Sequence, residues 1–274
     1  MTISPPPYIL KAVISSVAFA TLVGCDMIET HPYDTRIMGE TQIIEKNISR
    51  IEHCHNDDEE FCFAVISDTQ RWFDETEDCI NAINNRSDID FVLHCGDFAD
   101  FGLTKEFTLM RDLMADLNVP YFTAIGNHDC LATGEDVYKK IFGPTNYAFT
   151  VGNTRIISLN TNALEYDYSE PVPNFRFMGN ELYNPVQNIE KTIIMMHAPP
   201  QSDVFNNNVN EIFHRIVTQY RGLQFCIHGH THNIGVTDIF NDGILYYECP
   251  CIEKRKYLLF RIYREGYDYE VVEF

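Results

Sequence analysis

The sequence predicts an α/β (α+β) fold in which a mixed β-sheet sandwich is flanked by helices. From Phe61 onward, continuous apolar runs alternate with amphipathic segments, as expected for buried strands connected by helices. After residue 235 the apolar runs become short and roughly evenly spaced, which indicates strands that are joined by turns. These two observations together favour a mixed sheet with helices on the outside.

The first half of this pattern contains three strands and two helices. We expect strands at Phe61–Ser67, Phe91–Cys95 and Pro120–Ile125, and helices at Asp74–Ile83 and Thr104–Leu117. The continuous apolar run of the first strand is as expected for a strand that is buried on both faces. In the second helix, Thr104 suits the N-cap and apolar residues recur at helical spacing.

The second half contains a hairpin, two further strands and a β-rich tail. The hairpin is expected from Tyr147–Val151 and Arg155–Leu159, with its turn at Gly152-Asn153. Strands at Thr192–Met196 and Leu223–Ile227 enclose a helix at about residues 210–220. The tail is expected to be antiparallel, with strands at Val236–Phe240, Ile244–Glu248, Tyr257–Tyr263 and Tyr267–Val272.

The composition is that of a soluble globular chain with an excess of negative charge. Its 274 residues suffice for one or two well-buried domains, and its 45% apolar content is ordinary. The formal net charge of −20 argues against a nucleic-acid binder, because such a protein needs a basic face. Small phosphorylated substrates stay open, since bound cations can reverse the local field.

The first 25 residues are typical of a targeting segment. Lys11 is the only charged side chain, and the apolar stretch Ala12–Val23 is too short to span a bilayer. The stretch leads into Leu22-Val23-Gly24-Cys25, which resembles a bacterial lipoprotein cleavage box. The resemblance implies that Cys25 is lipidated and tethers the chain to a membrane of the bacterial cell envelope. The alternatives are an ordinary secretory signal or an apolar helix that is retained.

We therefore divide the chain into a signal peptide at residues 1–25, a linker at 26–57 and one folded domain at 58–274. The nine cysteines show no regular framework of a disulfide-stapled fold. Cys62, Cys95 and Cys226 fall inside apolar runs, where cysteine usually behaves as a small core residue. An exported location would permit one or two disulfides among the others, and the sequence does not assign them.

Five motifs place metal-ligand side chains directly after apolar runs. In chain order the motifs are Asp68-Thr69-Gln70, Gly96-Asp97-Phe98-Ala99-Asp100, Gly126-Asn127-His128-Asp129, His197-Ala198-Pro199-Pro200 and Gly229-His230-Thr231-His232. Ligand sites of α/β sheets lie at the carboxyl ends of the strands, so we expect these distant motifs to converge at one edge. The glycines allow sharp turns and close backbone approach just before the ligands. Carboxylates, an amide oxygen and imidazoles suit divalent ions.

In this order, the motifs resemble those of the calcineurin-like metallophosphoesterases, clearly over about residues 61–240. The resemblance implies the calcineurin-like metallophosphoesterase fold and a dinuclear centre that holds two divalent ions, either manganese, iron, zinc or magnesium. Asp97 would bridge the two ions. The first ion would be completed by Asp68, Gln70 and His232, and the second by Asn127, His197 and His230. His128 would be the general acid for the leaving group, oriented by Asp100, with Asp129 supporting the loop.

The chemistry of such a centre suits hydrolysis of a small phosphorylated substrate. Two nearby cations can clamp a phosphoryl group and lower the pKa of a bound water, which gives a metal-bound hydroxide that attacks phosphorus directly. A histidine titrates near pH 6.5, so His128 can donate a proton to the leaving group. No serine or cysteine nucleophile constellation competes with this interpretation. The substrate would be a phosphomonoester or a phosphodiester.

Gln70 is a departure, because the commonest form of the first motif has histidine at this position. A neutral amide oxygen is a weaker ligand than imidazole and would favour manganese, magnesium or iron. The alternative is that Gln70 does not bind metal, which would leave a one-metal or depleted site. Arg71 beside it is a candidate contact for a phosphate oxygen, although an exposed arginine without such a role fits equally well.

Two other functions stay open at this stage. One is a phosphodiesterase for cyclic nucleotides or nucleic acid, of which the acidic charge disfavours the nucleic-acid form. The other is a metal-binding envelope lipoprotein without catalysis, against which His128 argues because structural metal binding does not need it. Among the remaining histidines, we expect His94 and His228 to be packed near the ligand loops and His214 to be exposed on its helix.

Overall fold

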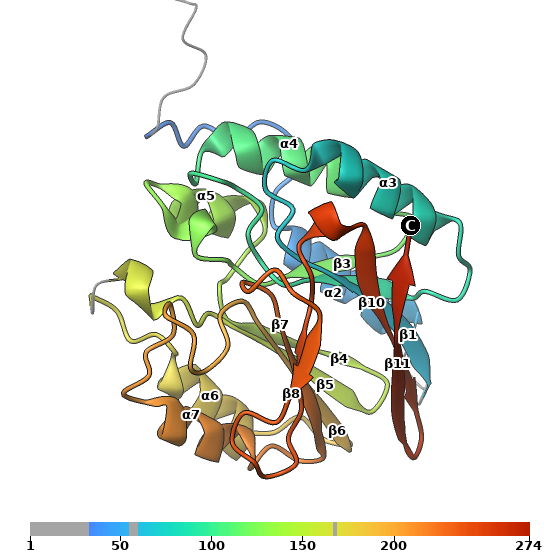
Figure 1. Ribbon diagram of the computed structural model, residues 1–274, viewed down its shortest axis with the longest axis vertical. Helices are drawn as coiled ribbons and strands as arrows, with labels where there is room; N and C mark the ends of the chain where they lie inside the picture. The colour runs from blue at the N-terminus through green and yellow to red at the C-terminus, as the bar shows by residue number, and fades with distance from the viewer. Residues whose placement is uncertain (1–32, 55–59, 167–168) are drawn as a thin grey trace, which may run out of the picture.

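The computed structural model describes residues 33–54, 60–166 and 169–274, which form two β-sheets with α-helices outside them (Figure 1). The mixed α/β fold is therefore confirmed. The first sheet has five strands. In spatial order they are β11 (Gly266–Glu273), β10 (Lys256–Tyr263), β1 (Phe61–Ile66), β2 (Phe91–His94) and β3 (Tyr121–Thr123).

The second sheet has six strands and contains the predicted hairpin. Its spatial order is β4 (Tyr147–Val151), β5 (Thr154–Leu159), β6 (Lys191–Met196), β7 (Leu223–His228), β9 (Tyr246–Glu248) and β8 (Gly235–Thr237). The central strands β5, β6, β7 and β9 run parallel to one another, as do β1, β2 and β3 in the first sheet. The tail was expected to be antiparallel, and its pairs β8–β9 and β10–β11 are antiparallel, whereas β9 runs parallel to β7.

Phenylalanine side chains fill the space between the two sheets. Phe122 of the first sheet stacks on Phe149 of the second, with ring centroids 3.8 Å apart. Phe260 stacks on Phe225 in the same way, with centroids 4.7 Å apart. All four rings are buried, so each contributes a large apolar surface to the packing. This core fixes the distance between the sheets and hence between their strand ends.

The described residues form six α-helices, of which five lie in two groups. Figure 1 shows α3 and α4 lying together above the first sheet, with α5 beside them, and α6 and α7 beneath the second sheet. The apolar faces of α6 and α7 join the outer face of β5, β6 and β7 in a second cluster. The helices are α2 (Ile43–Cys54), α3 (Phe73–Asn84), α4 (Thr104–Met114), α5 (Gly134–Ile141), α6 (Phe175–Tyr183) and α7 (Asn210–Val217).

Helix α2 belongs to the folded domain, although it lies within the segment that we expected to be a linker. Ile43, Ile44 and Ile51 are buried in the core, and α2 contacts β3 and β4. The buried Asn47 side chain donates through Nδ2 to the Tyr121 carbonyl at 2.8 Å. Residues 43–54 therefore extend the domain on the N-terminal side of residue 58. No helix in the described ranges combines the length and apolarity needed to cross a bilayer.

Two local predictions were wrong. Thr104 does not cap α4, because it is the first helical residue and its hydroxyl binds the Asp34 carbonyl. Instead, the Glu106 carboxylate accepts the N–H of Leu103 at 3.0 Å. His214 is buried rather than exposed, because its ring stacks on Phe240, and its Nε2 lies 2.8 Å from Asp242 Oδ2.

The cysteines of the described segments whose side chains are placed are all free thiols. Cys62, Cys95 and Cys226 are buried in the strands or just after them, as expected for small core residues. Burial raises the pKa of Cys251 to about 11, so this thiol is protonated at neutral pH. These thiols therefore serve packing and not cross-linking.

Candidate metal centre

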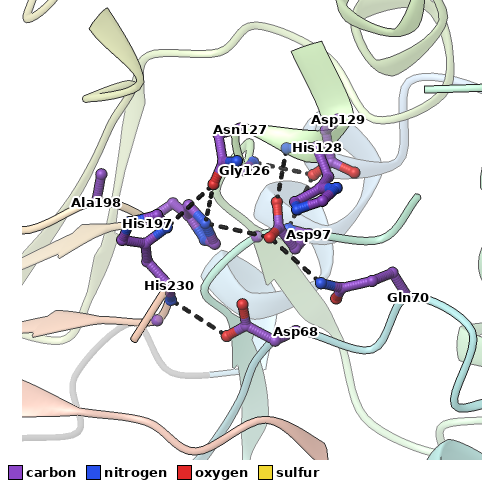
Figure 2. Close-up of polar contacts among 12 residues, drawn as sticks. Asp68, Gln70, Asp97, Gly126, Asn127, His128, Asp129, His197, Ala198 and His230 are labelled. Carbon is purple, nitrogen blue, oxygen red and sulfur yellow. Dashed lines mark hydrogen bonds and ion pairs between the residues drawn. The ribbon is translucent and has the colours of Figure 1, made fainter. Parts of the chain in front are cut away.

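The predicted ligand side chains converge at one edge of the sandwich, at the carboxyl ends of its parallel strands. The first sheet contributes Asp68 after β1, Asp97 after β2 and Asn127 after β3. The second sheet contributes His197 after β6 and His230 after β7. Figure 2 shows these side chains pointing toward one another across the gap between the two sheets. The convergence expected from the strand ends is therefore present.

Four of the seven predicted ligands have a left-handed backbone. The φ angles are 53° at Asp68, 63° at Asp97, 73° at His230 and 61° at His232. This region is uncommon for residues with a side chain, and such strain concentrates at functional sites. The turns that follow the strands direct these side chains into the centre.

Gly126 is required by the close approach of two ligand loops. A Cβ atom at this position would lie 2.0 Å from Asp97 Oδ1 and 2.2 Å from the Asp97 nitrogen. No side chain can be accommodated at such distances without moving the Asp97 loop. The predicted role of this glycine in close backbone approach is confirmed.

One group of donor atoms comes from Asp68, Asp97 and His232, whose ligand atoms all lie within 4.8 Å of one another. His232 Nε2 is 3.2 Å from Asp68 Oδ1. The Gln70 side chain is buried beside them and its Nε2 lies 3.4 Å from Asp97 Oδ2. The four residues predicted for the first ion are therefore neighbours.

A second group of donor atoms surrounds Asn127 Oδ1. This oxygen lies 3.0 Å from His197 Nε2 and 3.1 Å from His230 Nδ1. Asp97 Oδ2 is 3.4 Å from the same His197 nitrogen, so Asp97 contacts both groups (Figure 2). A carboxylate in this position can be shared by two cations.

In His197 and His230, the ring nitrogen that points away from the centre is held by a hydrogen-bond acceptor, which fixes the orientation of the ring. His197 Nδ1 lies 2.7 Å from the Cys95 carbonyl, which can only accept, so this nitrogen carries a proton. His230 Nε2 lies 3.1 Å from the Asp203 carboxylate and is held in the same way. When each ring is neutral, its inner nitrogen presents a lone pair, as is usual for histidines that bind metals.

Two buried oxygens of the predicted ligands have no hydrogen-bond partner. They are Asp68 Oδ1 and Gln70 Oε1, and an unsatisfied buried polar atom costs free energy. His232 lies near the first of them but not in hydrogen-bond geometry. A cation would satisfy both oxygens, and the set of oxygen and nitrogen donors suits a divalent ion. The residues present therefore fit a metal centre.

Asp97 and His197 stabilise each other's charge. Burial favours the neutral form of each group, but their mutual attraction outweighs it. The pKa of Asp97 is lowered from its ordinary value and the pKa of His197 is raised to about 9. A cation in this place would compete with the proton on His197, so its binding would release that proton.

Asp129 joins two ligand loops through backbone hydrogen bonds. Its Oδ2 accepts the N–H groups of Asp97 at 3.0 Å and Gly126 at 2.9 Å, and its Oδ1 accepts those of Phe98 and Ala99. The side chain is fully buried beneath the centre. Asp129 was expected to support the loop, and these contacts connect it to the backbone of both ligand loops.

His128 lies beside the donor groups and is half-buried. Its backbone N–H donates to Asp97 Oδ1 at 3.0 Å, and its ring Nδ1 lies 2.9 Å from the Asp100 carbonyl. Asp100 was expected to orient this ring, and it does contact the ring, but through its backbone. The Asp100 carboxylate binds the Arg71 guanidinium instead.

The other histidines near the ligand loops are packed, as expected. His94 is buried, its ring stacks on Phe98, and its Nε2 lies 2.9 Å from the Thr69 hydroxyl. Burial lowers its pKa to about 3, and that of His228 to about 4. Both rings are therefore neutral at pH 7.

Sequence reasoning missed Asp203 and Glu248 at the rim of this centre. Asp203 contacts His230, and the Glu248 carboxylate accepts from the Thr231 hydroxyl within the last motif. Neither residue belongs to a recognisable motif, and 27 residues separate Asp203 from its partner. These contacts depend on the conformation of the folded loops, which the sequence pattern does not reveal.

Solved structures of other proteins share this fold at low sequence identity. A protein titled "GAP50 the anchor in the inner membrane complex of Plasmodium" has a TM-score of 0.61 and 14% identity, over 79% of this chain and 85% of that one. A dimetal phosphatase from Danio rerio has a TM-score of 0.55 and 13% identity, over 78% and 98%. Purple acid phosphatase PPD1 from yellow lupin (Lupinus luteus) has a TM-score of 0.59 and 14% identity, over 79% and 52%.

The comparison with sequence families agrees with the geometry. Among curated proteins no match is found. The sequence model of the calcineurin-like phosphoesterases matches residues 62–233, which include all five motifs and more than half of the chain. The chain therefore belongs to the calcineurin-like phosphoesterase family.

Proposed function

We propose that this protein is a hydrolase that cleaves a small phosphoester with the help of two divalent metal ions. The observation that carries the proposal is the shared position of Asp97 between two groups of ligand atoms. Asp68, Gln70, Asp97 and His232 would hold one ion. Asn127, His197, His230 and Asp97 would hold the other. Manganese, iron, zinc and magnesium all accept such donors.

The bound ions, His128 and Asp129 would have different roles in hydrolysis. When bound, the ions would supply Lewis acidity and lower the pKa of a water molecule. His128 lies beside the ligand groups, and the proton on its Nδ1 faces the Asp100 carbonyl. A second proton on its Nε2 would be the one given to the leaving oxygen. Asp129 would keep the Asp97 and Gly126 loops together, so that the ligands stay in place.

The test is hydrolysis of 4-nitrophenyl phosphate and bis(4-nitrophenyl) phosphate by residues 26–274 after chelation. Re-addition of manganese, iron, zinc or magnesium should restore turnover, and the faster substrate would distinguish monoester from diester preference. His128→Ala should lower kcat by about 10²–10⁴-fold with an unchanged metal content, because general acid catalysis contributes about that much. Absence of turnover with every ion would favour a metal-binding protein without catalysis.

The same proposal includes a location at the cell envelope. Its support is the lipoprotein-like segment that ends in Cys25, which lies outside the described residues. A lipid on Cys25 would anchor the domain to a membrane without a spanning helix. The substrate would then be a small phosphorylated molecule, since the acidic charge of the chain disfavours nucleic acid.

A further inference from the structure

Arg71 connects the first ligand loop to the second. It follows Gln70 directly, and its Nε donates to Asp100 Oδ2 at 2.9 Å. Its Nη2 also binds Asp100 Oδ1, so the guanidinium grips both oxygens of the carboxylate. The Asp100 side chain is 15% exposed, whereas that of Arg71 is 58% exposed. The arginine therefore covers Asp100 from the solvent side.

The Arg71 backbone indicates a purpose beyond stability. A two-pronged arginine–carboxylate pair can stabilise a fold, although most ion pairs at the surface contribute little to the free energy of unfolding. The Arg71 backbone is also left-handed, with a φ of 64°, which is unfavourable for a residue with a long side chain. Strain of this kind is found where a side chain must be aimed at a functional group. The Arg71 side chain is directed at Asp100, and the Asp100 carbonyl in turn contacts His128 Nδ1.

We propose that Arg71 is a positioning residue for His128. By fixing both carboxylate oxygens of Asp100, it holds the Asp100 carbonyl 2.9 Å from His128 Nδ1 and keeps the proton on that nitrogen. The other ring nitrogen is thereby directed to the leaving group. This inference rests on the proposed role of His128 as proton donor. It differs from direct phosphate binding, for which Arg71 would have to use guanidinium N–H groups other than the two that bind Asp100.

The kinetic test compares two phosphomonoesters whose leaving groups differ in quality. A proton donor matters most for a poor leaving group. Arg71→Ala should therefore lower kcat about tenfold for phenyl phosphate and less than about threefold for 4-nitrophenyl phosphate, with KM unchanged. Asp100→Asn should behave in the same way. A rise in KM that is equal for both esters, with kcat unchanged, would show that Arg71 binds the phosphate and would overturn the proposal.

A matched control and a double variant test whether the kinetic effect of Arg71→Ala is specific to His128. Arg86 makes the same two-pronged contact with Asp88, away from the ligand loops, so Arg86→Ala should change neither constant. In a His128→Ala background, Arg71→Ala should have no further effect on kcat, because the group that it positions is gone. Additive losses in the double variant would contradict the proposal.

A spectroscopic test is independent of turnover. In ¹⁵N-labelled protein, His128 should show a protonated Nδ1, identified by its disappearance in His128→Ala. In the neutral ring of Arg71→Ala this signal should shift toward a mixture of the two tautomers, while Arg86→Ala leaves it unchanged. An unshifted signal in Arg71→Ala would overturn the positioning role. If wild-type protein shows no hydrolysis but the signal shifts, the proposed function fails while the contact itself is upheld.

Discussion

At the scale of single residues, Asp97 has the position on which most of the centre depends. We expect Asp97→Asn to reduce the bound metal from about two ions per chain to less than about one, because the shared carboxylate charge is lost. Asparagine tolerates a left-handed backbone, so the φ of 63° should persist and the fold should survive. Metal content after dialysis, measured by mass spectrometry, checks this. Asp78→Asn, at an exposed carboxylate paired with Arg255, is the control and should retain both ions.

We expect Gln70 to influence which ion the first site prefers. We expect Gln70→His to raise affinity for zinc about tenfold or more and to change affinity for manganese much less, since imidazole suits zinc better than an amide oxygen does. Competition with a coloured chelator measures both constants. Equal changes for the two metals, or none, would mean that Gln70 does not bind an ion, and its partnerless Oε1 would need another explanation.

The sequence predicted the residues that follow strands directly, since a strand end places its next side chain at the sheet edge. It did not predict contacts that depend on loop conformation. Asp203 reaches His230 from a loop 27 residues away, and Asp242 contacts His214 from 28 residues away. Asp100 was expected at the His128 ring, but which of its atoms makes the contact depends on where Arg71 lies.

At the scale of elements, the turn after β3 is as tightly constrained as the ligands. We expect Gly126→Ala to destabilise the protein by about 3 kcal/mol and to weaken metal binding, because the new methyl group would overlap Asp97. Gly266→Ala is the control, since a Cβ there meets no atom within 4 Å. Urea denaturation of both variants measures the difference. Equal stability of the two variants would show that the Asp97 loop yields without cost.

The end of β2 should make stability dependent on pH. Burial lowers the pKa of His94 to about 3, whereas an unfolded histidine titrates near 6.5. Between these values the unfolded chain binds a proton that the folded chain does not. The stability due to the neutral ring is therefore complete above about pH 6.5 and falls by up to about 1.4 kcal/mol per unit as the pH decreases.

A variant isolates this contribution from that of the carboxylates. His94→Asn should be less stable than wild type at pH 7, because stacking on Phe98 is lost. The difference should shrink at pH 6 and pH 5, since only the wild type carries the acid-sensitive ring. Urea denaturation at the three pH values provides the comparison, and a difference that stays constant would contradict the prediction.

Strands were more predictable than helices in this chain. The strands are continuous apolar runs such as Phe61–Ile66, and burial on both faces makes such runs visible in the sequence. Helices α5 and α6 were not predicted. Helix α5 has only eight residues and begins at Gly134, while α6 contains Gly179, and both glycines weaken the helical signal. These short helices form because the sheet and its neighbours offer them a surface to cover.

At the scale of the whole molecule, the N-terminal segment would anchor the folded domain to a membrane. We expect wild-type protein, expressed with its first 25 residues in a bacterial host, to incorporate labelled palmitate and to sediment with membranes. Cys25→Ser should abolish both, because the serine hydroxyl cannot form the thioether that anchors the lipid. Equal labelling of the two proteins, or none, would instead favour an ordinary secretory signal or a retained apolar helix.

The division of the ligands between two sheets has a consequence for the folding chain. Asp68, Asp97 and Asn127 follow strands of the first sheet, and His197 and His230 follow strands of the second. Neither sheet alone contains a competent set, so reactivity would arise only when the phenylalanine core has brought both into register. A nascent or half-folded molecule would thus not hydrolyse the phosphate esters around it. Ions bound by ligands from both sheets would also stabilise the folded state, because they would oppose separation of the two sheets.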